Sequence, residues 1–505
     1  MTATIGAALD WWARSQPSSP AFAFAEETLD YATVESWSSR VARRLVEQGV
    51  AEGDRVGLMG GNSVPWPIAA LGVMKAGAVL VPLNPRFKPA ELRKVLDDSG
   101  AQVVIADEPF IATVEAAAGL GAPVKPVGFA EIRAARAGEP DDFRIDRGAD
   151  DPIAIIFTSG STGLAKGVVL TNRTLMSIVF EASLTEDGFH RGSTSILVLP
   201  LAFTPGLVWG MLMTTVLGGK IVIESELVPG RAVRLIEEHK VEAIFGVPLV
   251  YQALSSAPEF ADADLSSLRT AVVGGAAVPV PLLEAWAAKD VALRQIYGMT
   301  EAGGIATSTL VSEFREHPGS CGSGLIFTRV KAVRPDGTDC DPGERGELVI
   351  AGPGVTPGYW EAPEVNKDVF RGGWLHTGDL GTVDGEGRVA FVDRLKDLII
   401  TGGINVSPVE LELAIAALPG VAECSVIAAP DPKFGETPAA IITAQGELTE
   451  QHVVEQLAQV VADYKVPRYV VLRDEPLPRL PNGKISKTEI RAEYADLVDR
   501  FPRIG

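Results

Sequence analysis

Residues 155–170 place the strongest constraint on how this chain can fold. The segment reads IIFTSGSTGLAKGVVL: an apolar run breaks into Gly, Ser and Thr, places one lysine, and returns to an apolar run. Consecutive small residues let the backbone bend so that several N–H groups face one point, and such a nest binds anions. Lys166 adds a positive charge suited to phosphate. The segment therefore predicts a phosphate-binding loop between two strands, with a Gly/Ser surface hairpin as the alternative.

This segment is not the G-x-x-x-x-G-K-[ST] loop of P-loop proteins, because Gly167 follows Lys166. A P-loop also runs from a strand into a helix, whereas both flanks here have the character of strands. The loop therefore indicates a phosphate-binding site of another class.

Composition and charge favour a folded protein with a large core. The 505 residues are 46% hydrophobic and 22% charged, and their number allows several domains. The formal net charge of −20 argues against nucleic acid as a partner, since that would need a basic surface. The three cysteines are odd in number and far apart, so they predict neither a disulfide framework nor a zinc site and favour a cytoplasmic location.

The hydrophobic segments predict no targeting or membrane-spanning element. The N-terminus lacks the basic stretch followed by an apolar run that is typical of a signal peptide. The most hydrophobic window, 66–83, is interrupted by Lys75 and by Gly and Pro residues, whereas a membrane helix needs ~20 apolar residues. We expect a buried helix followed by a strand, and no integral membrane association.

Strand and helix patterns alternate through the first 273 residues, which predicts an α/β fold with parallel sheets. In the first part we expect strands at 55–59, 78–81 and 103–106, and helices at 33–48, 68–75 and 89–99. The segment 119–149 has the composition of a connecting region. In a second α/β unit we expect strands at 196–200, 220–223, 243–246 and 271–273, and helices at 172–186, 207–216 and 231–239.

The pattern changes in the last third of the chain. Short strands and turn signals at 319–392 predict a small antiparallel or barrel-like region. Mixed helix and strand patterns then predict a small α+β unit of about 110 residues. We expect the boundary near 393–397, which divides the chain into domains of residues 1–394 and 395–505.

Nine short motifs follow one another along the chain. They are TSGSTGLAKG (158–167), GGAAVP (274–279), YGMTE (297–301), GEL (346–348), GYW (358–360), WLHTGD (374–379), RLKD (394–397), GGINVSPVE (402–410) and PNGK (481–484). Together they resemble the adenylate-forming superfamily, which contains acyl- and aryl-CoA synthetases, nonribosomal-peptide adenylation domains and beetle luciferases. Each motif alone is weak, but all nine stand in the family's order over essentially the whole chain.

The resemblance implies a large N-terminal domain of two doubly wound α/β subdomains plus a small β-barrel-like region, and a small mobile α+β C-terminal domain. It also implies an acid:CoA ligase. A carboxylic acid would attack the α-phosphate of ATP to form an acyl-adenylate, and coenzyme A would then take the acyl group. ATP, Mg²⁺ and coenzyme A are the implied cofactors. Displacement at phosphorus is limited by charge, so it needs positive groups and a metal.

The resemblance assigns roles in the first half-reaction to residues of the motifs. The phosphates would be held by Thr158, Ser159, Gly160, Ser161, Thr162, Gly163 and Lys166. Glu301 would help to bind Mg²⁺, a cation that prefers oxygen ligands, and Thr300 would contact the α-phosphate. The adenine would be bound by Gly274, Gly275, Ala276, Tyr297, Gly298 and Met299, and the ribose by Asp379 and Arg394. Lys484 would stabilise the charge that develops during adenylation.

The second half-reaction would need a different active face. The resemblance implies that the C-terminal domain rotates about Lys396, withdraws Lys484, and brings Gly402 and Gly403 to a tunnel for the pantetheine arm of coenzyme A. Glycine suits that place, because no side chain would block the thiol arm.

The expected acyl pocket is mostly apolar. Its lining would be Phe203, Thr204, Leu207, Val208, Met211, Gly246, Val247, Gly303 and Ile305. No basic residue in this set would pair with a second carboxylate, which favours a medium or bulky hydrophobic acid. The chain departs from the family where PLAFTPG at 200–206 replaces Pro-Leu-Phe-His, and where Ser161 and Ala165 replace the more usual Thr and Pro.

These departures leave alternatives open. One is a thioesterifying ligase that uses a preformed acyl-adenylate, another loads a carrier-protein thiol, and a third is a catalytically silent nucleotide-binding protein. Single residues also have purely structural interpretations: Asp379 as a turn cap, Lys484 as a solvated lysine, Tyr297 as core filling and Glu301 as a helix-start residue. The intact Lys484, Glu301 and Asp379 favour the full ligase. A homodimer is a further expectation.

Overall fold

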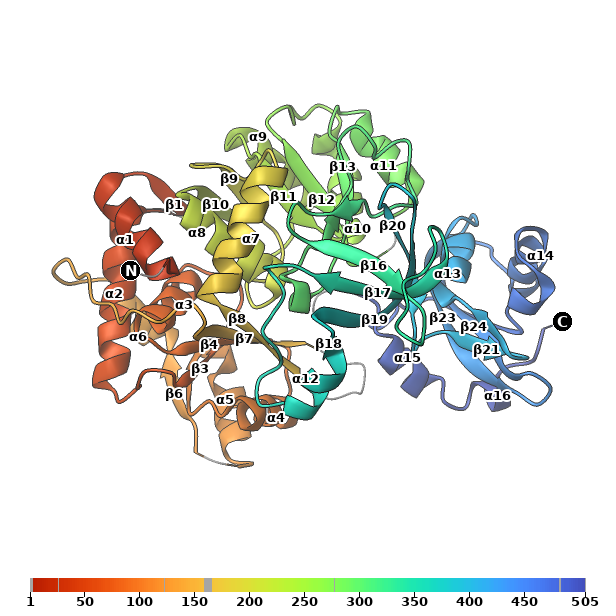
Figure 1. The fold of residues 1–505 in the computed structure, drawn as a ribbon, viewed down its shortest axis with the longest axis horizontal. Helices are drawn as coiled ribbons and strands as arrows, with labels where there is room; N and C mark the ends of the chain where they lie inside the picture. Colours follow the sequence, from red (N-terminus) through yellow and green to blue (C-terminus); the bar gives the residue numbers. More distant parts are fainter. Residues whose placement is uncertain are drawn as a thin grey trace. The chain divides into compact units, whose positions relative to one another are not determined.

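The computed structural model describes residues 3–25, 27–121, 123–158, 166–276, 278–480 and 483–504. The fold is mixed α/β, as the sequence predicts, with a large N-terminal and a small C-terminal domain (Figure 1). The chain also divides into two compact units, each made of several segments. The larger comprises Met1–Gly274, Val280–Val330 and Ile350–His376, and the smaller comprises Gly275–Pro279, Lys331–Val349 and Thr377–Gly505.

Six strands form the first sheet of the larger unit, in the order β6-β5-β3-β4-β7-β8. They are β3 (Arg55–Met59), β4 (Val79–Leu83), β5 (Val103–Ala106), β6 (Lys125–Gly128), β7 (Pro152–Thr158) and β8 (Lys166–Thr171). Strands β3 to β7 pair in parallel, whereas β8 turns back antiparallel to β7. The strands predicted at 55–59 and 103–106 are confirmed, and the one predicted at 78–81 begins one residue later.

Helices join these strands, and one of them accounts for the hydrophobic window. The helices are α2 (Tyr31–Glu47), α3 (Pro65–Lys75), α4 (Pro89–Ser99), α5 (Ile111–Ala118) and α6 (Phe129–Ala134). Every residue of α3 is buried, including Lys75, whose Nζ lies 2.7 Å from the Glu35 carboxylate on α2. The window is therefore a buried helix followed by β4, as predicted. Of the helices in the described part of the chain, none combines the length and apolar character needed to cross a membrane.

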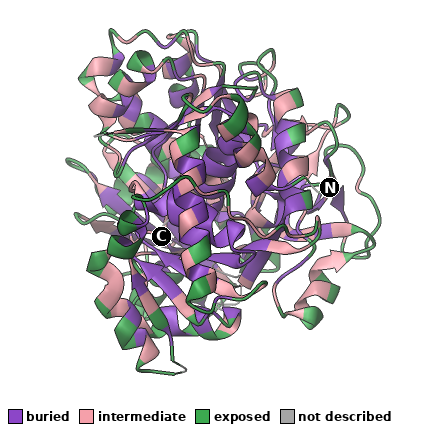
Figure 2. Ribbon diagram, turned by 90° about the vertical axis from the view of Figure 1, so that its left-hand side faces the viewer, coloured by how far each residue is buried: buried purple, intermediate pink, exposed green. Residues whose placement is uncertain are grey.

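Nine strands form the second sheet, in the order β15-β14-β13-β12-β11-β9-β10-β1-β2. They are β1 (Pro20–Ala23), β2 (Thr28–Asp30), β9 (Thr194–Leu197), β10 (Lys220–Ile223), β11 (Ala243–Gly246), β12 (Thr270–Val273), β13 (Leu293–Tyr297), β14 (Thr307–Ser308) and β15 (Ser323–Gly324). The accompanying helices include α1 (Ile5–Ser15), α7 (Asn172–Thr185), α9 (Pro229–Glu238), α10 (Pro248–Ser255) and α11 (Val280–Ala287). The strands predicted at 220–223 and 243–246 are confirmed, while those at 196–200 and 271–273 differ at their ends. Figure 2 shows that the buried residues gather on the strands and on the inner faces of the helices.

Two features of this unit differ from the sequence-based expectation. The first is that β1 and β2 join the second sheet, where Phe22 pairs with Ile221 of β10, although they precede the first sheet in the chain. The second is that the expected connecting region 119–149 contains β6 and α6. Strand β6 reads Lys-Pro-Val-Gly, a weak strand pattern, and it stands at the edge of its sheet, where a proline is tolerated.

The helix predicted at 207–216 is present but not regular. It begins as a π-helix at Pro205–Leu212 and continues as α8 (Met213–Leu217). Gly206 lets this segment approach the preceding loop, because a Cβ at this position would collide with the Pro200 carbonyl oxygen. π-Helical segments are rare, and those that occur are often located at functional sites. This irregular helix carries three of the residues predicted to line the acyl pocket, Leu207, Val208 and Met211.

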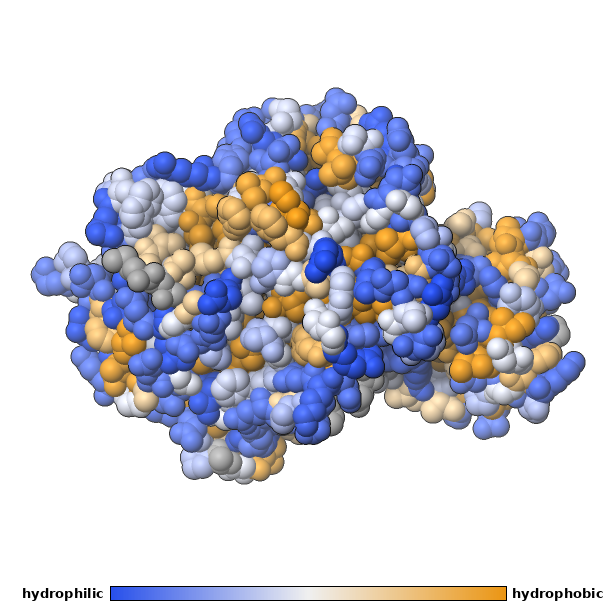
Figure 3. All heavy atoms as spheres, in the orientation of Figure 1, coloured by the Kyte–Doolittle hydropathy of each residue, from blue (hydrophilic) through white to orange (hydrophobic). Residues whose placement is uncertain are grey.

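Large apolar side chains are exposed over α7. Phe180 and Leu184 on α7, together with Ile326 and Phe327, are each about half exposed, and the rings of Phe180 and Phe327 stack with centroids 5.8 Å apart. Figure 3 shows this hydrophobic patch over α7.

A third sheet contains β16 (Arg329–Val333), β17 (Arg345–Ala351), β19 (Trp374–Val383) and β18 (Phe370–Arg371) in that order, with β20 (Val389–Arg394) beside β19. Strand β19 pairs antiparallel with both β18 and β20. The short helix α12 (Pro363–Val369) precedes β18. This sheet is the small region of short strands predicted at 319–392.

The last part of the chain forms the predicted α+β unit. Its strands are β21 (Ile399–Thr401), β22 (Ile404–Val406), β23 (Val421–Asp431), β24 (Gly435–Ala444) and β25 (Tyr469–Arg473), and its helices are α13 (Pro408–Ala416), α14 (Glu450–Val460), α15 (Lys487–Glu493) and α16 (Leu497–Arg500). Successive side chains of β24 point to opposite faces. Ala440 and Ile442 pack with α13 and α14, whereas Ala439 and Ile441 pack with α15 and α16, so both faces of the sheet are covered.

Candidate active site

Strands β7 and β8 form a hairpin that presents both ends of the predicted phosphate loop. Thr158 pairs with Lys166, and Phe157 with Gly167, in antiparallel register. The predicted strand–loop–strand arrangement is therefore present on both flanks. Five of the predicted phosphate ligands, Ser159, Gly160, Ser161, Thr162 and Gly163, and the departure at Ala165 lie outside the described residues.

Lys166, Tyr359 and Glu301 form a compact group. The Tyr359 hydroxyl donates a hydrogen bond to Glu301 Oε1 over 2.7 Å, and Lys166 Nζ lies 5.2 Å from the centroid of the Tyr359 ring. Glu301 and Tyr359 are only 6% and 7% exposed. The structure thus brings together the two charged residues that the resemblance placed around the phosphates. Sequence reasoning missed Tyr359 as a functional residue, although it lies in the Gly-Tyr-Trp motif.

Glu301 lies in a tight turn, the 3₁₀-helix Thr300–Ala302, which two glycines follow. Gly303 and Gly304 both have positive φ, +74° and +104°. A Cβ on Gly303 would lie 2.5 Å from the Ile178 side chain on α7, so this turn packs closely against that helix. The carbonyl of Gly303 accepts a hydrogen bond of 2.7 Å from Trp209 Nε1 on the π-helix. Trp209 is a second residue that sequence reasoning missed.

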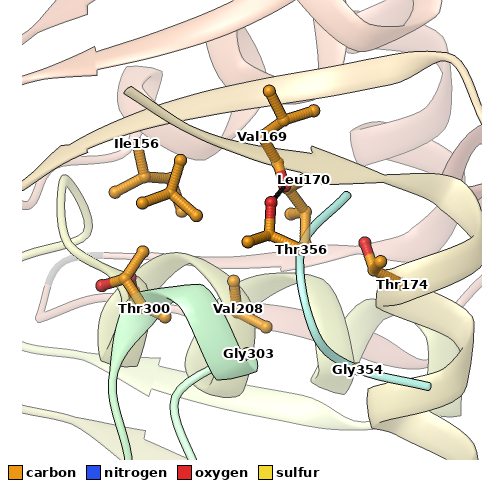
Figure 4. Close-up of a pocket in the computed structure, with 11 residues that line it drawn as sticks. Ile156, Val169, Leu170, Thr174, Val208, Thr300, Gly303, Gly354 and Thr356 are labelled. Carbon is orange, nitrogen blue, oxygen red and sulfur yellow. Dashed lines mark hydrogen bonds between the residues drawn. The ribbon is translucent and has the colours of Figure 1, made fainter. Parts of the chain in front are cut away.

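A small pocket of about 10 Å³, partly open to solvent, lies beside this turn (Figure 4). Its lining is Ile156, Val168, Val169, Leu170, Thr174, Thr204, Val208, Thr300, Gly303, Gly354 and Thr356. The hydroxyls of Thr204 and Thr300 lie 2.8 Å apart, and Thr356 Oγ1 donates to the Val169 carbonyl over 2.7 Å. The pocket is therefore apolar with a few threonine hydroxyls, and its lining contains no charged side chain.

The pocket contains only part of the predicted acyl lining. Thr204, Val208 and Gly303 line it, and so does Thr300. The other predicted lining residues are described elsewhere in the same unit: Leu207, Met211 and Ile305 in the core, Gly246 at the end of β11, and the partly buried Phe203 and Val247. Met211 is completely buried and does not line this pocket.

The predicted adenine-binding residues of the larger unit lie at the carboxyl ends of two neighbouring strands of the second sheet. Gly274 follows β12 and Tyr297 ends β13, and these two strands pair in parallel. Gly298 and Met299 follow directly, and a Cβ on Gly298 would collide with the Gly304 carbonyl oxygen. Ligands of open α/β sheets bind outside the carboxyl ends of the strands, where these residues lie. Gly275 and Ala276 belong to the smaller unit, where both are exposed.

Asp379, Arg394 and Lys484 form a charged group within the smaller unit. Asp379 and Arg394 face each other across β19 and β20, and Arg394 Nε lies 2.7 Å from Asp379 Oδ1. Loss of water around the ammonium group lowers the pKa of Lys484 from its ordinary value of 10.5; the Arg394 guanidinium lowers it further, while the Asp379 carboxylate opposes both. Lys484 as a residue is exposed, and Arg394 and Asp379 lie close enough to act on the charge of its ammonium group. Three predicted site residues are thus brought together.

The predicted hinge residue, Lys396, is close to an ion pair. Its neighbour Asp397 pairs with Arg491 on α15 over 2.8 Å, and Asp393 accepts hydrogen bonds from Ser407 Oγ and the Val409 N–H at the start of α13. Burial lowers the pKa of Lys396. Gly402 and Gly403, both at positive φ, form the turn between β21 and β22, where the Gly402 N–H donates to the Phe434 carbonyl.

Comparison with known proteins decides the family. The family described as AMP-binding enzyme matches residues 9–360, and the one described as AMP-binding enzyme C-terminal domain matches residues 410–484. The chain belongs to the AMP-binding enzyme family. This confirms the predicted superfamily: the first range includes the phosphate loop, Glu301 and Tyr359, and the second includes Lys484.

Relatives that match over nearly the whole chain indicate to which branch of the family it belongs. The chain is 38% identical to a feruloyl-CoA synthase of an Amycolatopsis species, over 95% of this chain and 97% of that protein. It is 36% identical to a long-chain-fatty-acid–CoA ligase of Mycobacterium tuberculosis, over 94% of both. Among solved structures, ATP-bound MatB from Rhodopseudomonas palustris superposes with a TM-score of 0.89 at 32% identity, over 98% of this chain and 100% of that chain.

This AMP-binding enzyme is therefore an ATP-dependent acid–thiol ligase of the AMP-forming acyl-CoA synthetase branch. Enzymes of this branch use ATP, Mg²⁺ and coenzyme A, and the o-succinylbenzoate CoA synthetase of Bacillus subtilis is known with ATP and magnesium, at a TM-score of 0.87, 27% identity and 96% and 99% coverage. The predicted reaction class and cofactors are confirmed.

The residues of the site fit the implied metal. Mg²⁺ is usually held by one or two carboxylates together with substrate phosphates and water, rather than by a cage of protein ligands. Glu301 offers one buried carboxylate. In the part of the chain that the structure describes, no group of three or more His, Cys, Asp or Glu side chains is arranged to hold a metal ion. This combination matches a metal that enters with the nucleotide.

Proposed function

We propose that this acyl-CoA synthetase activates a hydrophobic monocarboxylic acid. The observation that carries the proposal is the group of Lys166, Tyr359 and Glu301 beside a pocket that has no charged lining residue. A second carboxylate in such a pocket would lose its water without gaining a cation, which is costly. The names of two relatives specify an aromatic and a long-chain aliphatic acyl group, and both are hydrophobic. We place the substrate among aromatic, alicyclic and fatty acids.

In the first half-reaction, Lys166 and Thr158 would act with the phosphate loop on the β- and γ-phosphates, and Thr300 would contact the α-phosphate. Bound Mg²⁺ would neutralise phosphate charge, and Glu301 would be its protein ligand. Lys484 would stabilise the negative charge that grows as pyrophosphate leaves, since a fixed cation in a site with little water stabilises developing charge strongly.

The adenosine would bind at the carboxyl ends of β12 and β13. Tyr297 would stack on the adenine, and Gly274 to Ala276, Gly298 and Met299 would line it. The Asp379–Arg394 pair would take the ribose hydroxyls, because a carboxylate accepts two hydrogen bonds from a diol.

In the second half-reaction, a C-terminal domain of residues 395–505 would rotate about Lys396 relative to residues 1–394. Support comes from Lys484, Lys396 and the Gly402–Gly403 turn, which all belong to the smaller compact unit. The rotation would replace Lys484 with the glycine turn, which has no side chain to obstruct the thiol of coenzyme A.

Two further properties belong to the proposal. A homodimer is supported by the exposed apolar patch over α7, because large patches of this kind often mark interfaces. Light scattering at twice the chain's 53.3 kDa would support the dimer, and a value near 53.3 kDa would reject it. A cytoplasmic location is supported by Cys321, Cys340 and Cys424, which are thiols and not disulfides, as is usual for cytoplasmic proteins.

The Lys484→Ala variant tests whether Lys484 acts in the first half-reaction and not in the second. We expect acyl-adenylate formation to fall by about 10²–10³-fold, because a cation is lost at the site of developing charge. Conversion of a synthetic acyl-adenylate to acyl-CoA should stay near the wild-type rate. Equal loss of both half-reactions would contradict the proposal. A wild-type enzyme that converts only synthetic adenylates would instead support the use of a preformed adenylate.

A further inference from the structure

Tyr359 is the only described side chain for which the structure records both a hydrogen bond to Glu301 and a ring contact with Lys166. Its hydroxyl reaches one carboxylate oxygen over 2.7 Å, and its ring face lies under the ammonium group. A ring face attracts a cation, and a phenol hydroxyl donates to a carboxylate. One neutral side chain therefore contacts the two groups of opposite charge that act on the nucleotide phosphates in the proposed function.

The backbone of Tyr359 is held in place from both sides. The Asn366 side chain accepts from the Tyr359 N–H over 2.8 Å and donates to its carbonyl over 3.0 Å. The preceding Gly358 has a φ of +149°, and a Cβ there would lie 2.9 Å from the Asn366 amide. The glycine of the Gly-Tyr-Trp motif is thus needed for the asparagine to reach Tyr359.

The same loop is attached to the strand that carries Lys166. The Trp360 N–H donates to the Gly167 carbonyl over 2.7 Å, and the Val169 N–H donates to the Gly358 carbonyl over 3.2 Å. These bonds fix the phenol of Tyr359 relative to the start of β8. The position of the hydroxyl is therefore determined by β8 and not by a freely moving loop.

Glu301 is fixed at its backbone by this loop as well. The Thr356 N–H donates to the Glu301 carbonyl over 2.8 Å, while Thr356 Oγ1 donates to Val169 on β8. With the backbone fixed and one carboxylate oxygen bound by Tyr359, the orientation of the carboxylate is set before any ligand binds. A neutral donor leaves the full negative charge on the carboxylate, which a lysine or arginine partner would neutralise. Such partners of metal ligands tune metal affinity.

We propose that Tyr359 is a positioning residue that orients the Glu301 carboxylate toward Mg²⁺·ATP and holds Lys166 beside it. This inference rests on the roles of Glu301 and Lys166 in the proposed function. It adds a residue whose hydroxyl and ring have separate tasks: the hydroxyl acts on the metal ligand, and the ring acts on the phosphate-binding lysine.

The Tyr359→Phe variant removes the hydroxyl and keeps the ring. We expect the Mg²⁺ concentration needed for half-maximal acyl-adenylate formation to rise by about 10–100-fold, with little change in kcat at saturating Mg²⁺. The same shift should appear without turnover, in calorimetric titration of ATP into the enzyme at a series of Mg²⁺ concentrations. A matched control is Tyr31→Phe, which removes another buried hydroxyl, one that donates to the Gly219 carbonyl far along the chain. Its Mg²⁺ dependence should equal that of the wild type.

Two further variants, Glu301→Gln and Tyr359→Leu, distinguish a failure of the positioning role from a failure of the proposed function. If Glu301→Gln shifts the Mg²⁺ dependence and Tyr359→Phe does not, the positioning role is wrong and the proposed function stands. If neither variant shifts it, the role of Glu301 in the proposed function fails as well. Tyr359→Leu removes the ring also, so it should raise the KM for ATP above that of Tyr359→Phe. Equal KM values for these two variants would overturn the role of the ring.

Discussion

At the scale of single residues, the charged side chains of the site differ in the partners that surround them. Glu301 has a neutral hydrogen-bond donor, Tyr359, so its charge remains available to a cation. Asp379 instead pairs with a cation, Arg394, within hydrogen-bonding distance. Lys484 differs from both, because loss of water around its ammonium group and the Arg394 charge lower its pKa. The three residues therefore differ in how readily each keeps its charge.

The lowered pKa of Lys484 predicts how adenylation depends on pH. The ammonium form would stabilise developing negative charge, and a group with a lowered pKa loses its proton earlier as pH rises. Acyl-adenylate formation should therefore decline on the alkaline side at a pH below the ordinary lysine pKa of 10.5. A Lys484→Arg variant should be slower but without this decline, since arginine stays protonated. Single-turnover rates between about pH 7 and 10 measure both profiles; the same alkaline decline in the arginine variant would contradict the assignment.

At the scale of elements, three segments meet around Glu301. The β7–β8 hairpin carries Lys166, the loop before α12 carries Tyr359, and the Thr300–Ala302 turn carries Glu301 itself. Sequence reasoning found the two strands of the hairpin and the Tyr-Gly-Met-Thr-Glu motif that contains Glu301, because both patterns are local. It could not find the contact of Tyr359 with Glu301, since the two residues are 58 positions apart and the bond depends on the tertiary fold.

Packing of the Thr300–Ala302 turn against α7 gives a prediction for Gly303. A Gly303→Ala change places a Cβ at positive φ and 2.5 Å from Ile178. Positive φ costs about 1–2 kcal/mol for a non-glycine residue, and overpacking adds about 1–3 kcal/mol. Gly337→Ala is the matched control, because it has φ +85° and nothing within 4 Å of the added atom. Urea unfolding should show a greater loss of stability for Gly303→Ala, and equal losses would contradict the packing argument.

At the scale of the whole molecule, the sequence predicted the α/β class and most elements of the parallel sheets, since apolar strands and amphipathic helices are local patterns. It did not predict that β1 would cross to the second sheet beside β10, because Phe22 and Ile221 are brought together only by the completed fold. Nor did it predict that Lys75 would be buried with Glu35, since a lysine within an apolar window carries no signal of its partner. The nine motifs indicated the chemistry, whereas the tertiary fold supplied Tyr359 and Trp209.

The central claim is that this chain makes an acyl-adenylate from a free hydrophobic acid and passes the acyl group to coenzyme A. The most direct measurement is mass spectrometry of acyl-adenylate and acyl-CoA across a panel of aromatic, alicyclic, fatty and dicarboxylic acids, with ATP and Mg²⁺, with and without coenzyme A. We predict adenylate without coenzyme A, thioester with it, and preference for a hydrophobic monocarboxylic acid. Adenylate formation only from dicarboxylic acids, or thioester formation only from synthetic acyl-adenylates, would contradict this account.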